Sequence, residues 1–410
     1  MRVNNFFGDA FMKINVAVIF GCSSVEHEIS IISAVQAMHS FDREKYNVIP
    51  LYFSKNGEIY TGENLFDIEK FKNLTTLLAS LRKVALVKTD GKAVVKYLDT
   101  RRFHKDADIP VDVAFPIVHG TNCEDGSISG YLEVLGLPYV GCDVLSAAIG
   151  MDKKVFKDIL KSNNIPTLDC ISFTRREYSE SEDSIIEKLE KEIGYPMIVK
   201  PVNLGSSVGI SKAENNGELR SAITLSCTFS ERTLVEKAVK NLREINCSVV
   251  GNADSQEASV LEEPIMHDKI LSYDDKYRGE NRSKSGGSKG MASLGRKLPA
   301  DLSPEKTAEI QEIAKRTFKA FGANGVCRID FLLDTDDNDK VYVNEANTIP
   351  GSLSFYLWEA SGVKYKDLID KLISLAFTRE RARKNTMFTL DTNILSEKSF
   401  GFKGSKGGKA

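Results

Sequence analysis

The sequence has little of what metal-centred or disulfide-centred folds require. Its 410 residues include seven cysteines, none in a Cys-x-x-Cys pair, and five histidines, none in a His-x-x-x-His pair. An odd number of scattered cysteines in so long a chain argues against a disulfide framework and against a cysteine zinc site, and is typical of the reducing cytoplasm. The missing histidine spacing leaves a zinc hydrolase poorly supported.

Long apolar runs and an excess of one charge are also missing. No run of about 18 apolar residues occurs, so the sequence predicts no transmembrane helix and no membrane partner. The 55 basic and 57 acidic side chains give a net charge of −2, which supplies no overall attraction for nucleic acid. Hydrophobic residues make up 42% and charged residues 27% of the chain, fractions that argue against wholesale disorder.

The order of apolar segments indicates an α/β fold with several domains. Residues 15–21 form a continuous apolar run that ends in glycine, as in a buried strand of a parallel sheet. Helical spacing follows over residues 29–41, and residues 48–53 resemble a second strand. Such a strand–helix–strand unit predicts a right-handed crossover with helices on the faces of the sheet.

The last hairpin of the chain carries a candidate metal site. Arg328 and Asp330 alternate on one strand and therefore share a face, as do Glu345 and Asn347 on the next. If the hairpin turns at the middle of residues 335–340, Asp330 lies opposite Glu345 and Arg328 lies opposite Asn347. Two carboxylates and one amide oxygen suit a Mg²⁺ ion that keeps waters and binds phosphates. Taken alone, the hairpin is also compatible with a solvated acidic sheet face.

A glycine-containing loop provides a candidate phosphate site. Lys200 ends an apolar strand, and residues 205–209 (GSSVG) follow shortly after it. Glycines let the backbone approach a ligand closely, successive N–H groups cradle phosphate oxygens, and a lysine adds a point charge. The loop matches neither the Walker pattern nor G-x-G-x-x-G, and alone it is equally typical of an ordinary turn. Together with the acidic hairpin it indicates Mg²⁺-dependent phosphate chemistry.

Six separated motifs resemble a known family. In chain order they are residues 26–30 (EHEIS), 119–126 (HGTNCEDG), 151–153 (MDK), 200–209 (KPVNLGSSVG), 328–330 (RID) and 344–351 (NEANTIPG). From about residue 15 to residue 376 the chain resembles the ATP-grasp enzymes, and more closely the D-alanine–D-alanine ligases. The resemblance implies an α/β (α+β) architecture, in which an ATP-grasp fold is preceded by an N-terminal parallel α/β domain.

The resemblance and the composition together predict how the chain is divided. The expected parts are an extension (1–11), an N-terminal α/β domain (12–142), a central ATP-grasp subdomain (143–236), a C-terminal ATP-grasp subdomain (237–390) and a flexible basic tail (391–410). Within the C-terminal subdomain, the long polar stretch 268–292 is expected to be a lid over the site.

The resemblance also implies a reaction. ATP would phosphorylate the carboxylate of one D-alanine, and the amine of a second would attack the acylphosphate to give D-alanyl-D-alanine for cell-wall precursors. The expected cofactors are ATP and two Mg²⁺ ions, which Mn²⁺ can replace. The expected location is the cytoplasm, and the family suggests a homodimer.

Roles for individual residues follow from the resemblance. The metal ions would be held by Asp330, Glu345 and Asn347. ATP would be bound by Lys153, Lys200, Ser206 and Ser207 at the phosphates, Glu236, Lys237 and Val239 at the adenine, and Glu244 at the ribose. The amino-acid substrates would meet Glu26 at the first ammonium group, Arg328 and the N–H of Gly351 at the oxyanion, His119, Lys276, Tyr356 and Leu357. Glu26, Ser206 and the lid residue Tyr277 would form a hydrogen-bonded set.

The chain departs from the family pattern at several positions, and one of them leaves the acceptor open. Cys22 stands where a second glycine is usual, and the lid is longer than usual. Tyr356 replaces a serine that contacts the second substrate, so a ligase with another acceptor, such as D-serine, is a second reading. A third is a nucleotide-binding regulator without catalysis. Against the regulator stand the six retained residues Lys153, Lys200, Arg328, Asp330, Glu345 and Asn347.

Overall fold

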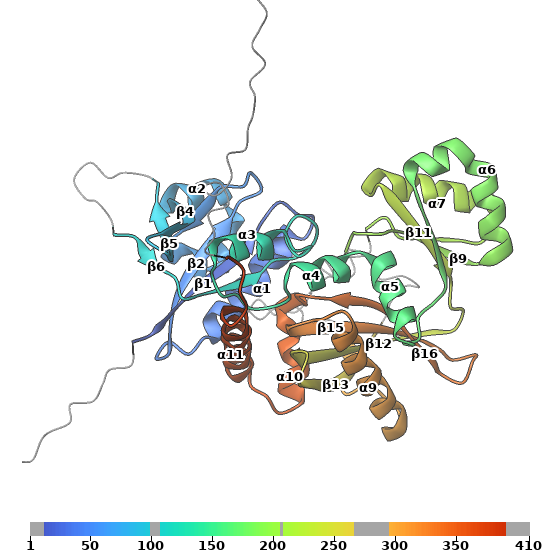
Figure 1. Ribbon diagram of the computed structural model, residues 1–410. Coiled ribbons are helices and arrows are strands. Elements are labelled where there is room, and N and C mark those ends of the chain that lie inside the picture. Colours follow the sequence, from blue (N-terminus) through green and yellow to red (C-terminus); the bar gives the residue numbers. More distant parts are fainter. Residues whose placement is uncertain (1–11, 99–106, 206–207, 266–294, 391–410) are drawn as a thin grey trace, which may run out of the picture.

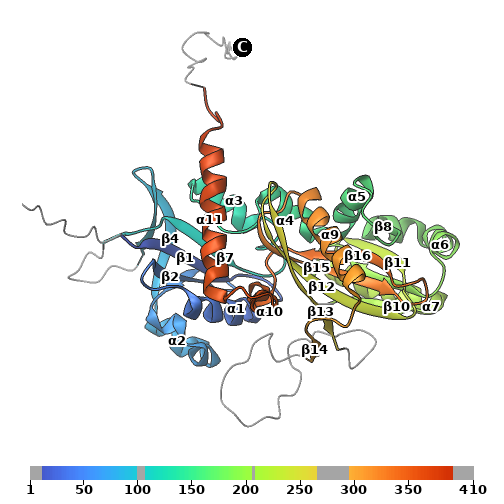
Figure 2. The ribbon, with the colours of Figure 1, turned by 90° about the horizontal axis from the view of Figure 1, so that it is seen from below.

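The computed structural model describes residues 12–98, 107–205, 208–265 and 295–390 (Figures 1 and 2). Within these ranges the strands form a seven-stranded, a four-stranded and a five-stranded sheet. The fold is mixed α/β, as the sequence predicts. No helix in the described ranges is both long enough and apolar enough to cross a membrane.

The first sheet has a parallel centre and an antiparallel extension, in the order β6-β5-β4-β3-β2-β1-β7. β1 (Ile14–Gly21) pairs in parallel with β2 (Tyr46–Phe53) and with β7 (Val113–Ile117), and α1 (His27–Ser40) connects β1 to β2 as expected. The extension consists of β3 (Ile59–Thr61), β4 (Arg82–Thr89), β5 (Lys92–Tyr97) and β6 (Ile109–Pro110). Short helical segments accompany this sheet: η1 (Glu63–Phe66), η2 (Ile68–Lys72), α2 (Leu74–Ser80) and α3 (Ser127–Leu135).

The chain returns to the first sheet at its end. Helix α11 (Tyr365–Lys384) lies beside α1 and β7, where Figure 2 shows it crossing the first sheet. Its buried Leu368 and Leu372 belong to the same apolar cluster as Val16 and Phe115 of that sheet. The predicted C-terminal part 237–390 therefore contributes to the core around the N-terminal sheet. The division into domains itself stays a prediction.

The second sheet is antiparallel, in the order β10-β9-β11-β8. Its strands are β8 (Cys170–Thr174), β9 (Met197–Pro201), β10 (Ser211–Ala213) and β11 (Arg232–Lys237). Helices α6 (Arg175–Glu192) and α7 (Asn216–Phe229) cover its outer side (Figure 1). Met197, Val199 and Val235 face these helices in one core. Because side chains alternate along a strand, Lys200 and Glu236 point to the other face.

The third sheet holds the acidic hairpin, in the order β14-β13-β12-β15-β16. Its strands are β12 (Leu242–Gly251), β13 (Gln256–Pro264), β14 (Arg296–Lys297), β15 (Gly325–Asp334) and β16 (Lys340–Asn347). Helix α9 (Pro304–Ala320) covers one face and begins with Ser303 as its N-cap, as predicted. The remaining helices are α4 (Val144–Met151) and α5 (Lys153–Ser162) before the second sheet, and η4 (Gly351–Ser354) and α10 (Phe355–Ala360) after the third.

Candidate active site

Two rows of polar residues cross one face of the third sheet. In the first row, Asn246 on β12 pairs with Glu262 on β13 and with Asp330 on β15, which in turn pairs with Glu345 on β16. In the second row, two residues along, the register aligns Ser248, Arg328 and Asn347. The alternate side chains, including those of Cys247 and Ile329, lie in the buried core under α9. Strand alternation thus separates an apolar core face from a polar face, which carries these two rows and is called the working face below.

The pairing predicted for the hairpin is present, although the turn differs from the expectation. The strands pair as Leu333 with Val341 and Asp334 with Lys340, which centres the turn on Asp337 rather than between residues 337 and 338. A β-bulge between Asp330 and Phe331 then shifts the register by one residue. The bulge restores the pairs Asp330–Glu345 and Arg328–Asn347 at the site. An extra residue of this kind re-aims side chains and is common beside active sites.

Cationic groups of the chain surround the two carboxylates. Arg328 donates two hydrogen bonds to Asp330, from Nε to Oδ1 (2.6 Å) and from Nη2 to Oδ2 (2.7 Å). Asn347 Nδ2 donates to the same Oδ2 (3.0 Å), and Lys153 Nζ lies 3.5 Å from Glu345 Oε2. Burial alone would lower the pKa of Arg328, but Asp330 outweighs it and raises that pKa. Both carboxylates therefore face positively charged groups.

This donor set fits a divalent cation that brings its own waters. Carboxylate and amide oxygens are hard ligands of the kind that Mg²⁺ prefers. In the part of the chain that the structure describes, no three His, Cys, Asp or Glu side chains gather as a complete metal cage. An ion at Asp330, Glu345 and Asn347 would thus complete its shell with water and phosphate oxygens, as Mg²⁺ commonly does.

The predicted phosphate-binding lysines lie next to this row. Lys153 donates from Nζ to the carbonyl oxygen of Leu204 (2.8 Å). Lys200 donates from Nζ to Glu236 Oε1 (2.5 Å) and to Asn344 Oδ1 (3.2 Å) in the bulge. Both lysine side chains are buried. Two buried lysine ammonium groups therefore lie where the second and third sheets meet, an arrangement that suits polyphosphate binding.

The side chains of the residues predicted to bind the adenine and the ribose do not all point to the same face. The carboxylate of Glu236 is buried between lysines, while Lys237 donates to the carbonyl oxygens of Gly194 (3.0 Å) and Tyr195 (2.7 Å). The Lys237 side chain therefore points away from the face that holds Lys200. Val239 follows β11 and is partly exposed, and Glu244 lies on the working face, two residues before Asn246.

A third buried lysine, which was not predicted from the sequence, lies at the same junction. Lys157 on α5 is fully buried, and its Nζ lies 3.0 Å from Glu236 Oε2. It lies one turn after Lys153 and shares a buried stripe with Phe156 and Leu160. A lysine within an apolar helical stripe was the available signal, because such a side chain requires a buried partner.

Glu26, directly before α1, lies where three segments meet. Glu26 is buried, and it is closely approached by Gly120 and Gly205. A β-carbon built on Gly120 would lie 2.7 Å from Glu26 Oε2, and one on Gly205 would lie 2.8 Å from the same oxygen. A larger residue at either position would displace the Glu26 carboxylate, and the left-handed φ of Gly120 (82°) also favours glycine. Glu26 therefore lies against the loop that precedes residues 206–207.

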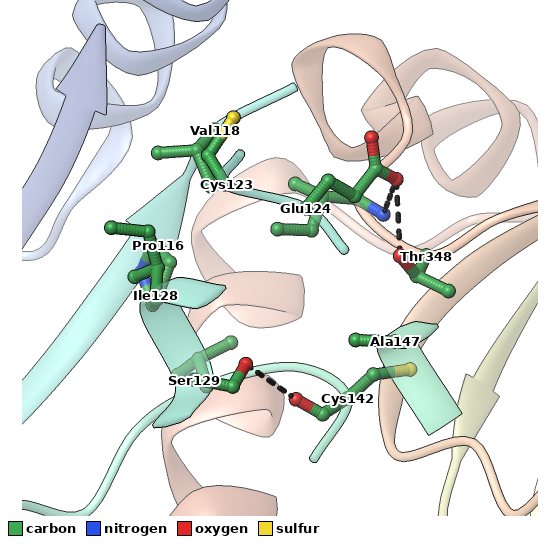
Figure 3. A pocket seen from close by; sticks show the side chains of 11 residues that line it. Pro116, Val118, Cys123, Glu124, Ile128, Ser129, Cys142, Ala147 and Thr348 are labelled. Carbon is green, nitrogen blue, oxygen red and sulfur yellow. Dashed lines mark hydrogen bonds between the residues drawn. The ribbon is translucent and has the colours of Figure 1, made fainter. Parts of the chain in front are cut away.

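Glu124, between β7 and α3, is hydrogen-bonded to the segment that follows β16 (Figure 3). Its carboxylate accepts hydrogen bonds from the N–H of Ile349 (2.8 Å), the hydroxyl of Thr348 (3.0 Å) and the N–H of Gly120 (3.1 Å). Burial and the nearby charge of Glu26 raise the pKa of Glu124 to about 7. The neighbouring cavity measures about 10 Å³ and is thus no larger than a water site.

His119 and Cys22 lie at the ends of the central strands. His119 is buried, and its Nε2 lies 3.2 Å from the hydroxyl of Ser33, which accepts a hydrogen bond from the N–H of Ser352 (2.9 Å). Burial lowers the pKa of His119 to about 4, so the ring is neutral near pH 7. Cys22 has a φ of 72°, a left-handed conformation that glycine adopts most easily, which explains the glycine usual at this position.

The segment after the hairpin is strained. Gly351 begins η4, and Ser352, Leu353 and Ser354 have φ values of 50°, 56° and 51°. Three successive left-handed non-glycine residues are costly and persist only where the surroundings hold them, as at ligand sites. This turn lies at the predicted oxyanion position, Gly351.

Tyr356 and Leu357 are less open to substrate than the sequence suggests. The Tyr356 hydroxyl donates to Glu262 Oε1 (2.7 Å), and the Leu357 side chain is fully buried. Arg296 stacks on the Tyr356 ring, with its guanidinium carbon 4.0 Å from the ring centre, and donates to Glu262 Oε2 (2.7 Å). Glu262 thus binds both the tyrosine and the arginine beside Arg328.

Four predicted site residues lie outside the described residues. They are Ser206, Ser207, Lys276 and Tyr277, together with the predicted lid 268–292. The hydrogen-bonded set of Glu26, Ser206 and Tyr277 therefore stays a prediction.

Comparisons with known proteins identify the family of the chain. The family model "D-ala D-ala ligase N-terminus" matches residues 15–142, and "D-ala D-ala ligase C-terminus" matches residues 159–374. The D-alanine–D-alanine ligase of Thermosipho melanesiensis is 40% identical over 387 residues, which cover 94% of this chain and 99% of that protein.

Solved structures give the same family. The D-alanine–D-alanine ligase of Coxiella burnetii matches with a TM-score of 0.75 at 31% identity, covering 91% of this chain and 96% of that one. The VanG D-Ala:D-Ser ligase of Enterococcus faecalis matches with a TM-score of 0.74 at 29% identity, covering 89% and 100%. The chain therefore belongs to the D-alanine–D-alanine ligase family, ATP-dependent ligases with the ATP-grasp fold.

Proposed function

We propose that this protein joins two D-alanine molecules, with ATP and Mg²⁺, into D-alanyl-D-alanine for cell-wall precursors. The observation that carries the proposal is the hairpin register, which sets Asp330 opposite Glu345 and Arg328 opposite Asn347. Lys153 contacts the same row through Glu345, and Lys200 contacts it through Asn344. These are the groups that phosphoryl transfer to a carboxylate requires.

In the first step the γ-phosphoryl group passes from ATP to a carboxylate oxygen of one D-alanine, and ADP leaves. Lys153 and Lys200 would bind phosphate oxygens, and Ser206 and Ser207 would cover the γ-phosphate with their N–H groups and hydroxyls. Asp330, Glu345 and Asn347 would hold a Mg²⁺ ion, which would supply positive charge to the phosphates. The family uses ATP and a divalent cation in general, and two Mg²⁺ ions are part of this proposal.

In the second step the amine of another D-alanine attacks the acyl carbon, the amine loses a proton and phosphate leaves. Glu26 orients the first substrate through its ammonium group. Arg328 and the N–H of Gly351 donate to the oxygen that becomes negative, where fixed donors stabilise the transition state. A lid carrying Lys276 and Tyr277 would exclude water from the acylphosphate.

A panel experiment tests the proposal. Phosphate release is measured with Mg²⁺ and ATP against single D-amino acids and D-hydroxy acids and their pairs, and product masses are determined in parallel. The proposal predicts turnover with D-alanine alone and the mass of D-alanyl-D-alanine. ATP binding without turnover on any substrate would favour the nucleotide-binding regulator instead.

A ligase that adds D-serine as the second amino acid is the alternative that one observation favours. Tyr356 stands where a serine is usual, and its hydroxyl is already bound to Glu262. Glu262 could accept a hydrogen bond from a serine hydroxyl if the tyrosine moved aside, and a solved relative is a D-Ala:D-Ser ligase. In the panel experiment this alternative predicts turnover only when D-serine accompanies D-alanine.

A cytoplasmic location and a homodimer complete the proposal. All seven cysteines are free thiols in the structure, which supports a reducing environment. Sedimentation of the purified protein tests the homodimer.

A further inference from the structure

Three charged side chains form a buried cluster at the junction of the second and third sheets. Lys157 Nζ lies 3.0 Å from Glu236 Oε2, and Lys200 Nζ donates to Glu236 Oε1 at 2.5 Å. The side chains are 0%, 3% and 4% exposed for Lys157, Glu236 and Lys200. One carboxylate is thus shared by two ammonium groups, one on each oxygen.

This cluster carries one positive charge too many. Burial alone would raise the pKa of Glu236, but Lys157 and Lys200 outweigh it and lower the pKa to about 2, so the carboxylate is ionised. Burial lowers the pKa of the Lys157 ammonium group, and the charge of Glu236 opposes this effect. With both lysines protonated, two ammonium groups face one carboxylate. An excess buried charge is unfavourable unless another ion balances it. The cluster is built to receive an anion, and Lys200 already belongs to the predicted phosphate site.

The two lysines differ in what else they contact. Lys200 also donates to Asn344 Oδ1 (3.2 Å), and Asn344 precedes the predicted metal ligand Glu345. Lys157 instead donates to the hydroxyl of Thr167 (3.0 Å), which in turn donates to the carbonyl oxygen of Val343 (2.9 Å). Lys157 is thus held in place by Thr167, whereas Lys200 lies next to the predicted metal ligand Glu345.

We infer that Lys157 is a positioning residue that frees Lys200 for the nucleotide phosphates. Because Lys157 holds the second oxygen of Glu236, Lys200 can exchange Glu236 for a phosphate oxygen without leaving a buried carboxylate unpaired. This inference rests on the proposed function, because it needs ATP at Lys200. Lys157 would thus support nucleotide binding without touching the nucleotide or the amino acids.

The Lys157→Met variant distinguishes this role from a structural one. Methionine has a similar length and no charge, so Glu236 and Lys200 remain as a balanced pair. Since the buried excess charge is gone, thermal stability should be retained or increased. Lys200 stays on Glu236, so the affinity for Mg²⁺–ADP, measured by titration calorimetry, should fall about 10- to 100-fold, the worth of one charge-assisted hydrogen bond. A merely structural lysine would give lower stability and unchanged affinity.

Two further variants complete the test. Lys161→Met removes an exposed lysine one turn later on α5, whose partner is Asp169 at 2.7 Å, and should leave Mg²⁺–ADP affinity unchanged. The double variant Lys157→Met/Glu236→Gln removes the carboxylate that would trap Lys200. Its Mg²⁺–ADP affinity should therefore equal that of Glu236→Gln alone, which carries any loss of the predicted adenine contact. If Lys157→Met does not fold, the double variant still decides the matter, because unchanged affinity relative to Glu236→Gln alone supports the inference and a further loss contradicts it.

The result that would overturn the inference is a folded Lys157→Met protein that binds Mg²⁺–ADP like the wild type. Failure of the proposed function looks different, because the wild-type protein itself would then show no Mg²⁺–ADP binding or no turnover with D-alanine.

Discussion

Arg328 holds Asp330 with two parallel hydrogen bonds, at 2.6 Å and 2.7 Å, although the two residues lie on the same strand. The predicted oxyanion donor is thereby fixed by a predicted metal ligand. The same carboxylate, Asp330, thus positions the arginine and supplies negative charge to the predicted metal site.

Asp330→Asn should therefore harm both functions of the pair. It removes one metal ligand charge and leaves a partly buried guanidinium without its carboxylate. We expect kcat to fall by roughly 100-fold or more, and stability by about 3 kcal/mol. Phosphate-release kinetics and urea unfolding measure these effects. Asp337→Asn in the exposed turn is the matched control, and equal behaviour of the two variants would contradict the pairing argument.

Gly205→Ala should weaken the binding of the first D-alanine. The added methyl group would lie 2.8 Å from Glu26 Oε2 and would push the carboxylate from its position. The KM for D-alanine should rise by about tenfold while thermal stability changes little, because only the end of a flexible side chain must move. Gly217→Ala on α7, where the nearest atom would be 3.5 Å away, is the control. An unchanged KM would show that Glu26 does not bind the ammonium group.

Tyr356→Ser should shift acceptor choice toward D-serine. Loss of the ring opens space beside Arg328 and frees Glu262 Oε1 to accept a hydrogen bond from the substrate hydroxyl. With both amino acids present, the ratio of mixed to symmetric dipeptide, read by mass, should rise by about tenfold. Tyr356→Phe keeps the ring and should leave the ratio near that of the wild type. A ratio that is the same in all three proteins would place Tyr356 outside the acceptor site.

Glu124 predicts a pH dependence of stability. Its pKa is about 7 in the folded protein and 4.5 in the unfolded chain, so the folded state binds more protons between these values. Its contribution to stability is therefore largest below pH 4.5 and is lost as the pH rises through 7. Glu124→Gln does not titrate, so its stability deficit relative to the wild type should shrink from pH 5 to pH 8, by up to about 2 kcal/mol. A deficit that is constant with pH would contradict the raised pKa.

The working face was predictable because it depends on local rules. Strand alternation places Arg328 with Asp330 and Glu345 with Asn347, and a short turn brings the two strands together. The bulge that follows Asp330 was not predictable, since a shift of one residue in the turn and a compensating extra residue leave the same apolar pattern.

Features that depend on contacts distant in sequence could not be read from the chain. The burial of Lys157 requires Glu236 from another sheet, and the engagement of Tyr356 requires Glu262 from β13. Likewise, α11 has an ordinary amphipathic pattern that does not say which sheet it covers. In each case the side chain's role follows from tertiary packing rather than from its neighbours in sequence.

The formation of an acylphosphate is the central claim, and oxygen transfer tests it most directly. D-alanine labelled with ¹⁸O in its carboxylate is incubated with the protein, Mg²⁺ and ATP, and the released phosphate is analysed by mass. The account predicts one ¹⁸O atom in each phosphate, because a carboxylate oxygen leaves with the phosphoryl group during dipeptide formation. Phosphate without label, released at the rate of ATP consumption, would contradict it.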